Sequence, residues 1–197
     1  MINIAEHFYS IQGEGANSGK AAYFIRLSGC DVGCPWCDSL FAWKVGGGEA
    51  FSESDIVNKV VASGAKAAVI TGGEPLMQNL DVLTGMLKDK GIEVWIETSG
   101  TKPFSGVFDW VCLSPKKFKK PLDDAFKRAS ELKVVIGNKE DFLWAEECAK
   151  KVGSQCKLLL QPEWNVEANM LSQIIEYVKC NQMWKISLQT HKYMNIR

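Results

Sequence analysis

The chain has 197 residues, 23 Lys and Arg against 23 Asp and Glu, 46% hydrophobic residues and seven Cys. This length suits one globular domain, and the composition argues against a disordered, collagen-like or coiled-coil protein. The balanced charge excludes the broad basic field that by itself would indicate a nucleic-acid or membrane partner. No apolar run has the length of a membrane span and the first residues lack the pattern of a signal peptide, so we expect a cytoplasmic protein whose cysteines are thiols or metal ligands.

Short apolar runs alternate with amphipathic segments along the chain. The patterns predict strands at 23–27, 67–71, 93–97, 110–113, 133–136, 157–160 and 185–188, and helices at 54–63, 80–89, 122–130, 140–151 and 166–179. Strands that are apolar throughout and joined by helices indicate a parallel sheet of the α/β class. A full eight-stranded barrel takes roughly 250 residues, so about six strand–helix units indicate an incomplete (β/α)6 TIM-like barrel.

Polar motifs follow the predicted strands. The carboxyl ends of parallel strands form the binding face of such folds, so these motifs are expected to meet at one rim. They are the cysteine-rich loop after 23–27, Gly72-Gly73-Glu74-Pro75, Thr98-Ser99-Gly100, Ser114-Pro115-Lys116 and Gln161-Pro162.

Three of the seven cysteines lie close together. Cys30, Cys34 and Cys37 have the spacing Cys-x3-Cys-x2-Cys, whereas the remaining four are scattered singly and are typical of small core residues. Three thiolates on a short loop can hold one corner of an iron–sulfur cluster and leave a fourth position open. A structural zinc site has four ligands, and ferredoxin runs supply a fourth cysteine. The alternative is a zinc knuckle with a remote fourth ligand.

This spacing resembles that of the radical S-adenosylmethionine enzymes. The resemblance implies a 4Fe-4S cluster on the three cysteines, with S-adenosylmethionine on the fourth iron and Trp36 against its adenine. It also implies that Gly73 and Glu74 receive the methionine ammonium. Each of these motifs taken alone is also compatible with a plain turn or a solvated strand end. The other positions that the resemblance assigns to this cofactor are Asp38, Ser99, Ser114, Pro115, Lys116 and Gln161.

Further motifs narrow the resemblance. Ile11-Gln12-Gly13-Glu14-Gly15, Cys37-Asp38-Ser39, Glu97-Thr98-Ser99-Gly100-Thr101 and Gln189-Thr190-His191-Lys192-Tyr193 are similar to motifs of the 7-carboxy-7-deazaguanine synthase family, from about residue 6 to the carboxyl terminus. The resemblance implies one radical S-adenosylmethionine domain over 1–197. It also implies a lyase that converts 6-carboxy-5,6,7,8-tetrahydropterin to 7-carboxy-7-deazaguanine with loss of ammonia, in the biosynthesis of queuosine-type 7-deazapurines.

The same resemblance implies a substrate site. Ile11, Gln12, Gly13 and Glu14 would bind the guanidine-like edge and amide of the pterin; the alternative is a glycine-rich turn before the first strand. Arg26 stands among apolar neighbours and needs an anionic or polar partner, either the substrate or a protein carboxylate. Thr71 would add a hydroxyl, and the backbone carboxylate of Arg197 would reach the site. The segment 189–192 would close over it, unless His191 is an ordinary surface residue.

Ser39 departs from the family pattern. The family has Thr after Cys-Asp, and that side-chain oxygen binds Mg²⁺ near the substrate. Serine keeps the oxygen and loses the methyl group that restricts its rotamer. We therefore expect Mg²⁺ binding through Ser39; the alternative is a residue that only caps the loop.

Other functions remain open at this stage. A glycyl-radical-enzyme activase also carries such a cysteine loop, and a non-enzymatic iron–sulfur or zinc module needs only the loop. The family resemblance suggests a homodimer and a flavodoxin-type reductant. The lysine-rich run at 116–120 would attract an acidic electron donor or would simply be a solvated loop.

Overall fold

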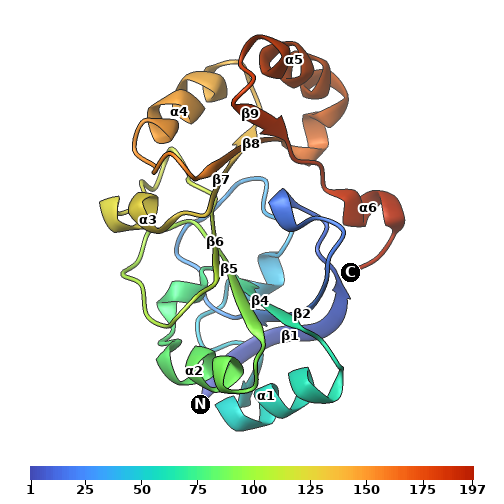
Figure 1. Ribbon diagram of the computed structural model, residues 1–197, viewed down its shortest axis with the longest axis vertical. Coiled ribbons are helices and arrows are strands. Elements are labelled where there is room, and N and C mark those ends of the chain that lie inside the picture. Colours follow the sequence, from blue (N-terminus) through green and yellow to red (C-terminus); the bar gives the residue numbers. More distant parts are fainter.

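The computed structural model describes residues 1–197 and contains one nine-stranded sheet (Figure 1). The strand order is β3-β1-β2-β4-β5-β6-β7-β8-β9. β1 pairs antiparallel with β2 and β3, and every pair from β2 to β9 is parallel. The predicted α/β class with a mostly parallel sheet is therefore confirmed. The strands are β1 (Ile2–Ile11), β2 (Ala21–Leu27), β3 (Glu49–Phe51), β4 (Ala67–Gly72), β5 (Glu93–Thr98), β6 (Trp110–Leu113), β7 (Glu131–Ile136), β8 (Lys157–Pro162) and β9 (Trp184–Ile186).

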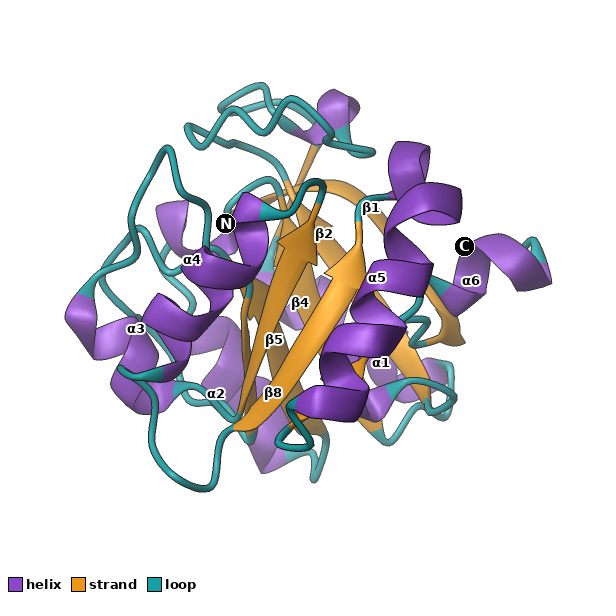
Figure 2. Ribbon diagram, turned by 90° about the horizontal axis from the view of Figure 1, so that it is seen from above, coloured by secondary structure: helices purple, strands orange, loops and turns teal.

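Helices surround the strands (Figure 2). Every predicted strand and helix is present, with small shifts at the ends. Ser52 caps the first helix by accepting a hydrogen bond from the Asp55 amide at 3.1 Å. No helix is both long and apolar enough to span a membrane. The helices are α1 (Glu53–Ala62), α2 (Asp81–Asp89), α3 (Asp123–Arg128), α4 (Glu140–Ala149), α5 (Glu167–Cys180) and α6 (Thr190–Met194).

The amino-terminal strand β1 was not predicted from the sequence. Its register against β2 shifts between Ile4 and Glu6, and most of its residues are half-buried. The bulge interrupts the two-residue alternation that reveals a strand in sequence. β3 and α6 are also additions, and both are too short to produce a periodic pattern. β1 has a functional consequence, because its end leads into the predicted substrate residues Gln12 and Glu14.

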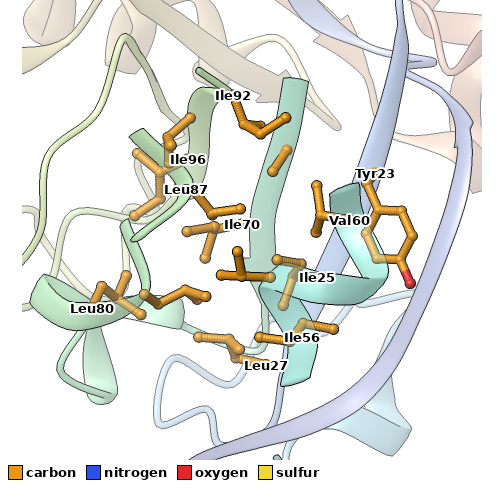
Figure 3. Close-up of a cluster of buried hydrophobic side chains, with 14 of the residues drawn as sticks. Tyr23, Ile25, Leu27, Ile56, Val60, Ile70, Leu80, Leu87, Ile92 and Ile96 are labelled. Atoms are coloured by element: carbon orange, nitrogen blue, oxygen red, sulfur yellow. The ribbon is translucent and has the colours of Figure 1, made fainter. Parts of the chain in front are cut away.

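The two faces of the sheet carry different side chains, because successive residues of a strand point to opposite sides. Ile25, Ile70 and Ile96 on β2, β4 and β5 belong to a core of 19 buried residues that also includes residues of α1 and α2 (Figure 3). A second core of 13 buried residues involves β6 to β9 and α3 to α5. The residues one position along face the other way. They include Arg26, Thr71, Glu97, Lys133 and Gln161, which line a cavity.

Candidate active site

One cavity brings together the inner face of the sheet, the cysteine loop (residues 28–39) and the carboxyl-terminal segment (residues 189–197). Pro115 is the one predicted site residue that does not line it. The strand-end motifs therefore meet in one cavity, as expected. The predicted residues that line the cavity are Ile11, Gln12, Gly13, Glu14, Arg26, Cys30, Cys34, Trp36, Cys37, Asp38, Ser39, Thr71, Gly73, Glu74, Ser99, Ser114, Lys116, Gln161 and Arg197.

The three clustered cysteines lie on the loop that follows β2, and none forms a disulfide. Burial raises the pKa of Cys30 and Cys34, and the charge of Cys37 adds to both shifts. Thiols in such a place lose their protons on binding a metal. Cys30, Cys34 and Cys37 all line the same cavity, and thiolates are the usual ligands of iron–sulfur clusters, so the chemistry of this donor set fits such a cluster.

The turn at Gly73 and Glu74 touches the cysteine loop directly. The Glu74 amide donates to the Gly29 carbonyl at 2.9 Å. A Cβ atom on Gly73 would lie 2.2 Å from that carbonyl oxygen and 2.9 Å from the Cys30 Cβ, so only glycine permits the contact. The turn therefore fixes the distance between the end of β4 and the loop that carries the thiols.

The buried carboxylate of Glu74 connects this turn to the end of β5. Its Oε1 accepts hydrogen bonds from the Thr98 hydroxyl at 2.6 Å and the Leu76 amide at 3.1 Å. Its Oε2 accepts from the Ser99 amide at 2.9 Å and from the Ser99 hydroxyl. Because protein groups already use both oxygens, Glu74 orients the rim as well as lining the cavity.

Two other predicted cofactor residues have partners of their own. The Lys116 Nζ donates to the Ser114 carbonyl at 2.6 Å and hydroxyl at 2.7 Å, and burial lowers the pKa of Lys116. The Gln161 amide donates to Glu14 Oε2 at 3.1 Å. Gln161 thus contacts a residue predicted for the substrate.

Glu14 is the centre of a buried polar network. Its Oε2 accepts from Lys133 Nζ at 2.6 Å and its Oε1 accepts from the Gln189 amide at 2.7 Å. Lys133, only 4% exposed, also donates to Glu97 Oε2 at 2.9 Å. The Gln12 amide donates to the other Glu97 oxygen at 3.0 Å. Burial raises the pKa of Glu14, but the charge and hydrogen bond of Lys133 outweigh it and bring the pKa to about 2.

Arg26 has a protein partner as well as a place in the cavity wall. Its Nε donates to Glu6 Oε1 at 2.8 Å, and its Nη1 is 3.4 Å from the Gly72 carbonyl oxygen. The ion pair with a protein carboxylate was one of the two alternatives for this residue, and it is formed here. Thr71 lies in the same wall.

Ser39 is buried beside Asp38 at the end of the cysteine loop. The Ser39 hydroxyl donates to Asp38 Oδ1 at 3.1 Å, and Lys192 Nζ lies 3.6 Å from Asp38 Oδ2. A hydroxyl and a carboxylate oxygen side by side suit a hard divalent cation.

The carboxyl-terminal segment folds back over β1, and the C-terminus lies beside the end of that strand (Figure 1). The Ser10 hydroxyl donates to a terminal carboxylate oxygen of Arg197 at 2.6 Å, and the Thr190 amide donates to the Gly13 carbonyl at 2.8 Å. A Cβ atom on Gly13 would lie 2.4 Å from His191 Nδ1. His191 is therefore packed into the cavity wall, and burial lowers its pKa.

Comparison with known proteins decides the family. Residues 11–103 match the family described as a 4Fe-4S single cluster domain. The 7-carboxy-7-deazaguanine synthase of Flavobacterium psychrophilum is 49% identical over 196 residues, which cover 100% of this chain and 93% of that protein. The synthase of Synechocystis sp. is 46% identical and covers 98% of this chain and 93% of its own. The chain belongs to the 7-carboxy-7-deazaguanine synthase family.

A solved structure agrees with this assignment to the 7-carboxy-7-deazaguanine synthase family. The crystal structure of QueE from Escherichia coli has a TM-score of 0.84 and 31% sequence identity, covering 95% of this chain and 93% of that chain. The resemblance noted in the motifs is thereby confirmed. The protein is an enzyme of the radical S-adenosylmethionine class with an iron–sulfur cluster.

Three residues that contact the candidate site residues are not among those predicted from the sequence. Lys133 is a charged residue at the start of a predicted apolar strand. A charge among apolar strand residues is also the signal that identifies Arg26, so the sequence does contain a signal for Lys133. Glu97 lies in a recognised motif but was given no role. Trp43 donates its indole N–H to Cys37 Sγ at 3.2 Å, and nothing in the cysteine spacing indicates that contact.

Proposed function

We propose that this protein converts 6-carboxy-5,6,7,8-tetrahydropterin to 7-carboxy-7-deazaguanine with loss of ammonia, in the biosynthesis of queuosine-type 7-deazapurines. One observation carries the proposal: the cysteine loop and the Gln12–Glu14 network open into the same cavity. A radical generator and a site for a polar heterocycle thus share one cavity. The chain acts as one domain, 1–197, with an incomplete (β/α)6 barrel, which the sheet order with β3 and β9 at its two edges supports.

At one end of the cavity, Cys30, Cys34 and Cys37 hold the cluster, and the rim around Gly73 and Ser99 holds S-adenosylmethionine. When bound, these two groups supply the one-electron chemistry that removes a hydrogen atom from the substrate. The protein holds these two groups in position. Glu74 keeps the turn and the end of β5 in place, and exposed Trp36, 38% accessible, offers its ring face to an adenine. Asp38, Ser114, Pro115, Lys116 and Gln161 complete the proposed cofactor wall, with Gln161 at its boundary with the substrate.

At the other end, Glu14 binds the pterin edge that presents N–H groups. With its pKa at about 2 it is ionised at neutral pH, and an ionised carboxylate only accepts hydrogen bonds. Gln12 offers both a donor and an acceptor beside it, and the backbones of Ile11 and Gly13 continue the same surface. Arg26 attracts the substrate carboxylate, and its ion pair with Glu6 sets the direction of the guanidinium. Thr71 adds a hydroxyl to this wall.

Ser39 binds Mg²⁺ through its hydroxyl in this proposal. Support comes from the neighbouring Asp38 oxygen, 3.1 Å from the Ser39 hydroxyl. The terminal carboxylate of Arg197 approaches the same cavity, because the last residue is held against Ser10 of β1.

The proposed partners follow from the family and from the surface. We propose a homodimer, and the exposed side chains of Tyr9, Tyr193 and Met194 provide apolar surface for one. We also propose a cytoplasmic location with a flavodoxin-type reductant, and seven cysteines without a disulfide fit a reducing compartment. The lysine-rich run contributes less steering than its composition suggests, because Lys117 pairs with Asp141 and Lys119 pairs with Asp31.

Anaerobic reconstitution with iron and sulfide, followed by incubation with S-adenosylmethionine, dithionite, Mg²⁺ and 6-carboxy-tetrahydropterin, tests the proposal. The expected product is the deazapurine, with release of ammonia. Consumption of S-adenosylmethionine without deazapurine would contradict the proposed function and favour an activase. A Glu14→Gln variant, which removes the carboxylate but keeps its size, is expected to raise the KM for the pterin while the cluster remains intact.

A further inference from the structure

The segment after the cysteine loop is held against that loop by its backbone. Leu40–Ala42 form a short 3-10 turn, and Ala42 is completely buried. The Gly29 amide donates to the Ala42 carbonyl at 2.8 Å, and the Cys30 amide donates to the Trp43 carbonyl at 3.0 Å. These two adjacent bonds leave the Trp43 backbone little freedom relative to the thiols.

The Trp43 side chain uses this position to reach a sulfur atom. Its indole Nε1 donates to Cys37 Sγ at 3.2 Å. The Ser39 backbone amide faces the same sulfur at 3.4 Å. An indole N–H can only donate a hydrogen bond, so in this contact Trp43 is the donor and the sulfur is the acceptor. Trp36, by contrast, makes a T-shaped contact with Phe118, with ring centroids 5.8 Å apart.

We infer that the Trp43 indole N–H sets the reduction potential of the iron–sulfur cluster through the sulfur of Cys37. A hydrogen-bond donor to a cluster sulfur stabilises the reduced state, which carries one more negative charge, and therefore raises the potential. Trp43 makes the cluster easier to reduce by a cellular donor and correspondingly weaker as a reductant. The inference rests on cluster binding at the three cysteines. It adds a positioning and tuning residue outside the cysteine motif.

The test is an EPR-monitored redox titration of the reconstituted enzyme without S-adenosylmethionine or substrate. Trp43→Phe removes the donor and some volume, and replacement of Trp43 by benzothienylalanine removes the N–H but keeps the ring shape. Both variants are expected to have a more negative midpoint potential than the wild type. The remote control Trp144→Phe, which lies outside the cavity, is expected to leave the potential unchanged. Pulsed EPR should detect the exchangeable indole proton coupled to the reduced cluster in the wild type. The benzothienylalanine variant should lack this coupling and keep that of the Ser39 amide.

The benzothienylalanine variant decides the question even where Trp43→Phe loses its cluster. An unchanged potential in that variant overturns the inference, and so does a shift of equal size in Trp144→Phe. Wild-type protein that holds no cluster would overturn both this inference and the proposed function. Wild-type protein with a cluster but no deazapurine product would reject the function alone, because the potential is measured without substrate.

Discussion

Lys133→Met removes the one ammonium group at the centre of the buried network and keeps most of the side-chain volume. Glu14 and Glu97 then lose hydrogen bonds of 2.6 and 2.9 Å to Lys133 Nζ. The two carboxylates are only 18% and 20% exposed, so water replaces the lost partner poorly. The variant therefore leaves two half-buried anions without their counter-charge.

Two independent figures give the size of the effect. Lowering the pKa of Glu14 from its ordinary 4.5 to about 2 corresponds to about 3 kcal/mol, at 1.36 kcal/mol per unit; Lys133 makes the largest favourable contribution, with smaller ones from Gln189 and Gln161. Removal of one partner from a buried ion pair typically costs about 3–5 kcal/mol. We expect the free energy of unfolding of Lys133→Met at pH 7 to fall by about 3–5 kcal/mol, measured by chemical denaturation of the anaerobic protein.

The pH dependence provides the control for this explanation. In the wild type the pKa of Glu14 is depressed, so its stabilising contribution is complete above pH 4.5 and is lost as pH falls towards 2. In Lys133→Met the burial remains without the ammonium, so the pKa rises and protonation relieves the unpaired charge. The difference in the free energy of unfolding between Lys133→Met and the wild type should therefore become smaller as pH falls. A deficit below about 1 kcal/mol at pH 7, or one that grows on acidification, would refute the reasoning. Lys133→Arg keeps the charge and should lose less stability than Lys133→Met.

Three further predictions concern the rim and the chain end. Gly73→Ala brings a Cβ to 2.2 Å from the Gly29 carbonyl oxygen, so we expect the cysteine loop to be displaced and iron incorporation to fall sharply. Full iron content in this variant would show that the turn does not hold the loop in place. Ser39→Ala should abolish most of the stimulation of turnover by Mg²⁺, measured as rate against magnesium concentration, and unchanged stimulation would count against this ligand. A short extension after Arg197 moves the terminal carboxylate away from Ser10, so we expect a several-fold loss of turnover, whereas a fully active tagged protein would exclude a role for that carboxylate.

Much of the architecture was predictable because it is local. Ala67–Gly72 is apolar almost throughout, and Glu53–Ala62 repeats its apolar residues every three or four positions, so each segment reveals its own structure. β1 was not predictable, since its bulge at Ile4 to Glu6 breaks the alternation and its partners β2 and β3 supply the hydrogen bonds. The hydrophobic alternation of β1 is weak, and the strand is stabilised by hydrogen bonds to β2 and β3, which its own sequence does not reveal.

The sequence by itself determined the cysteine loop and the strand-end location of the site. The spacing of Cys30, Cys34 and Cys37 limits where three thiols on one short loop can point, and parallel strands bring their carboxyl ends to one rim. Only the tertiary structure decided how Glu14 meets Lys133, 119 positions away, and how Trp43 meets the sulfur of Cys37. The first contact depends on the order and register of the sheet, which bring the connection after β1 beside β7. The second depends on two backbone hydrogen bonds between loops, which have no signature in spacing or hydrophobicity.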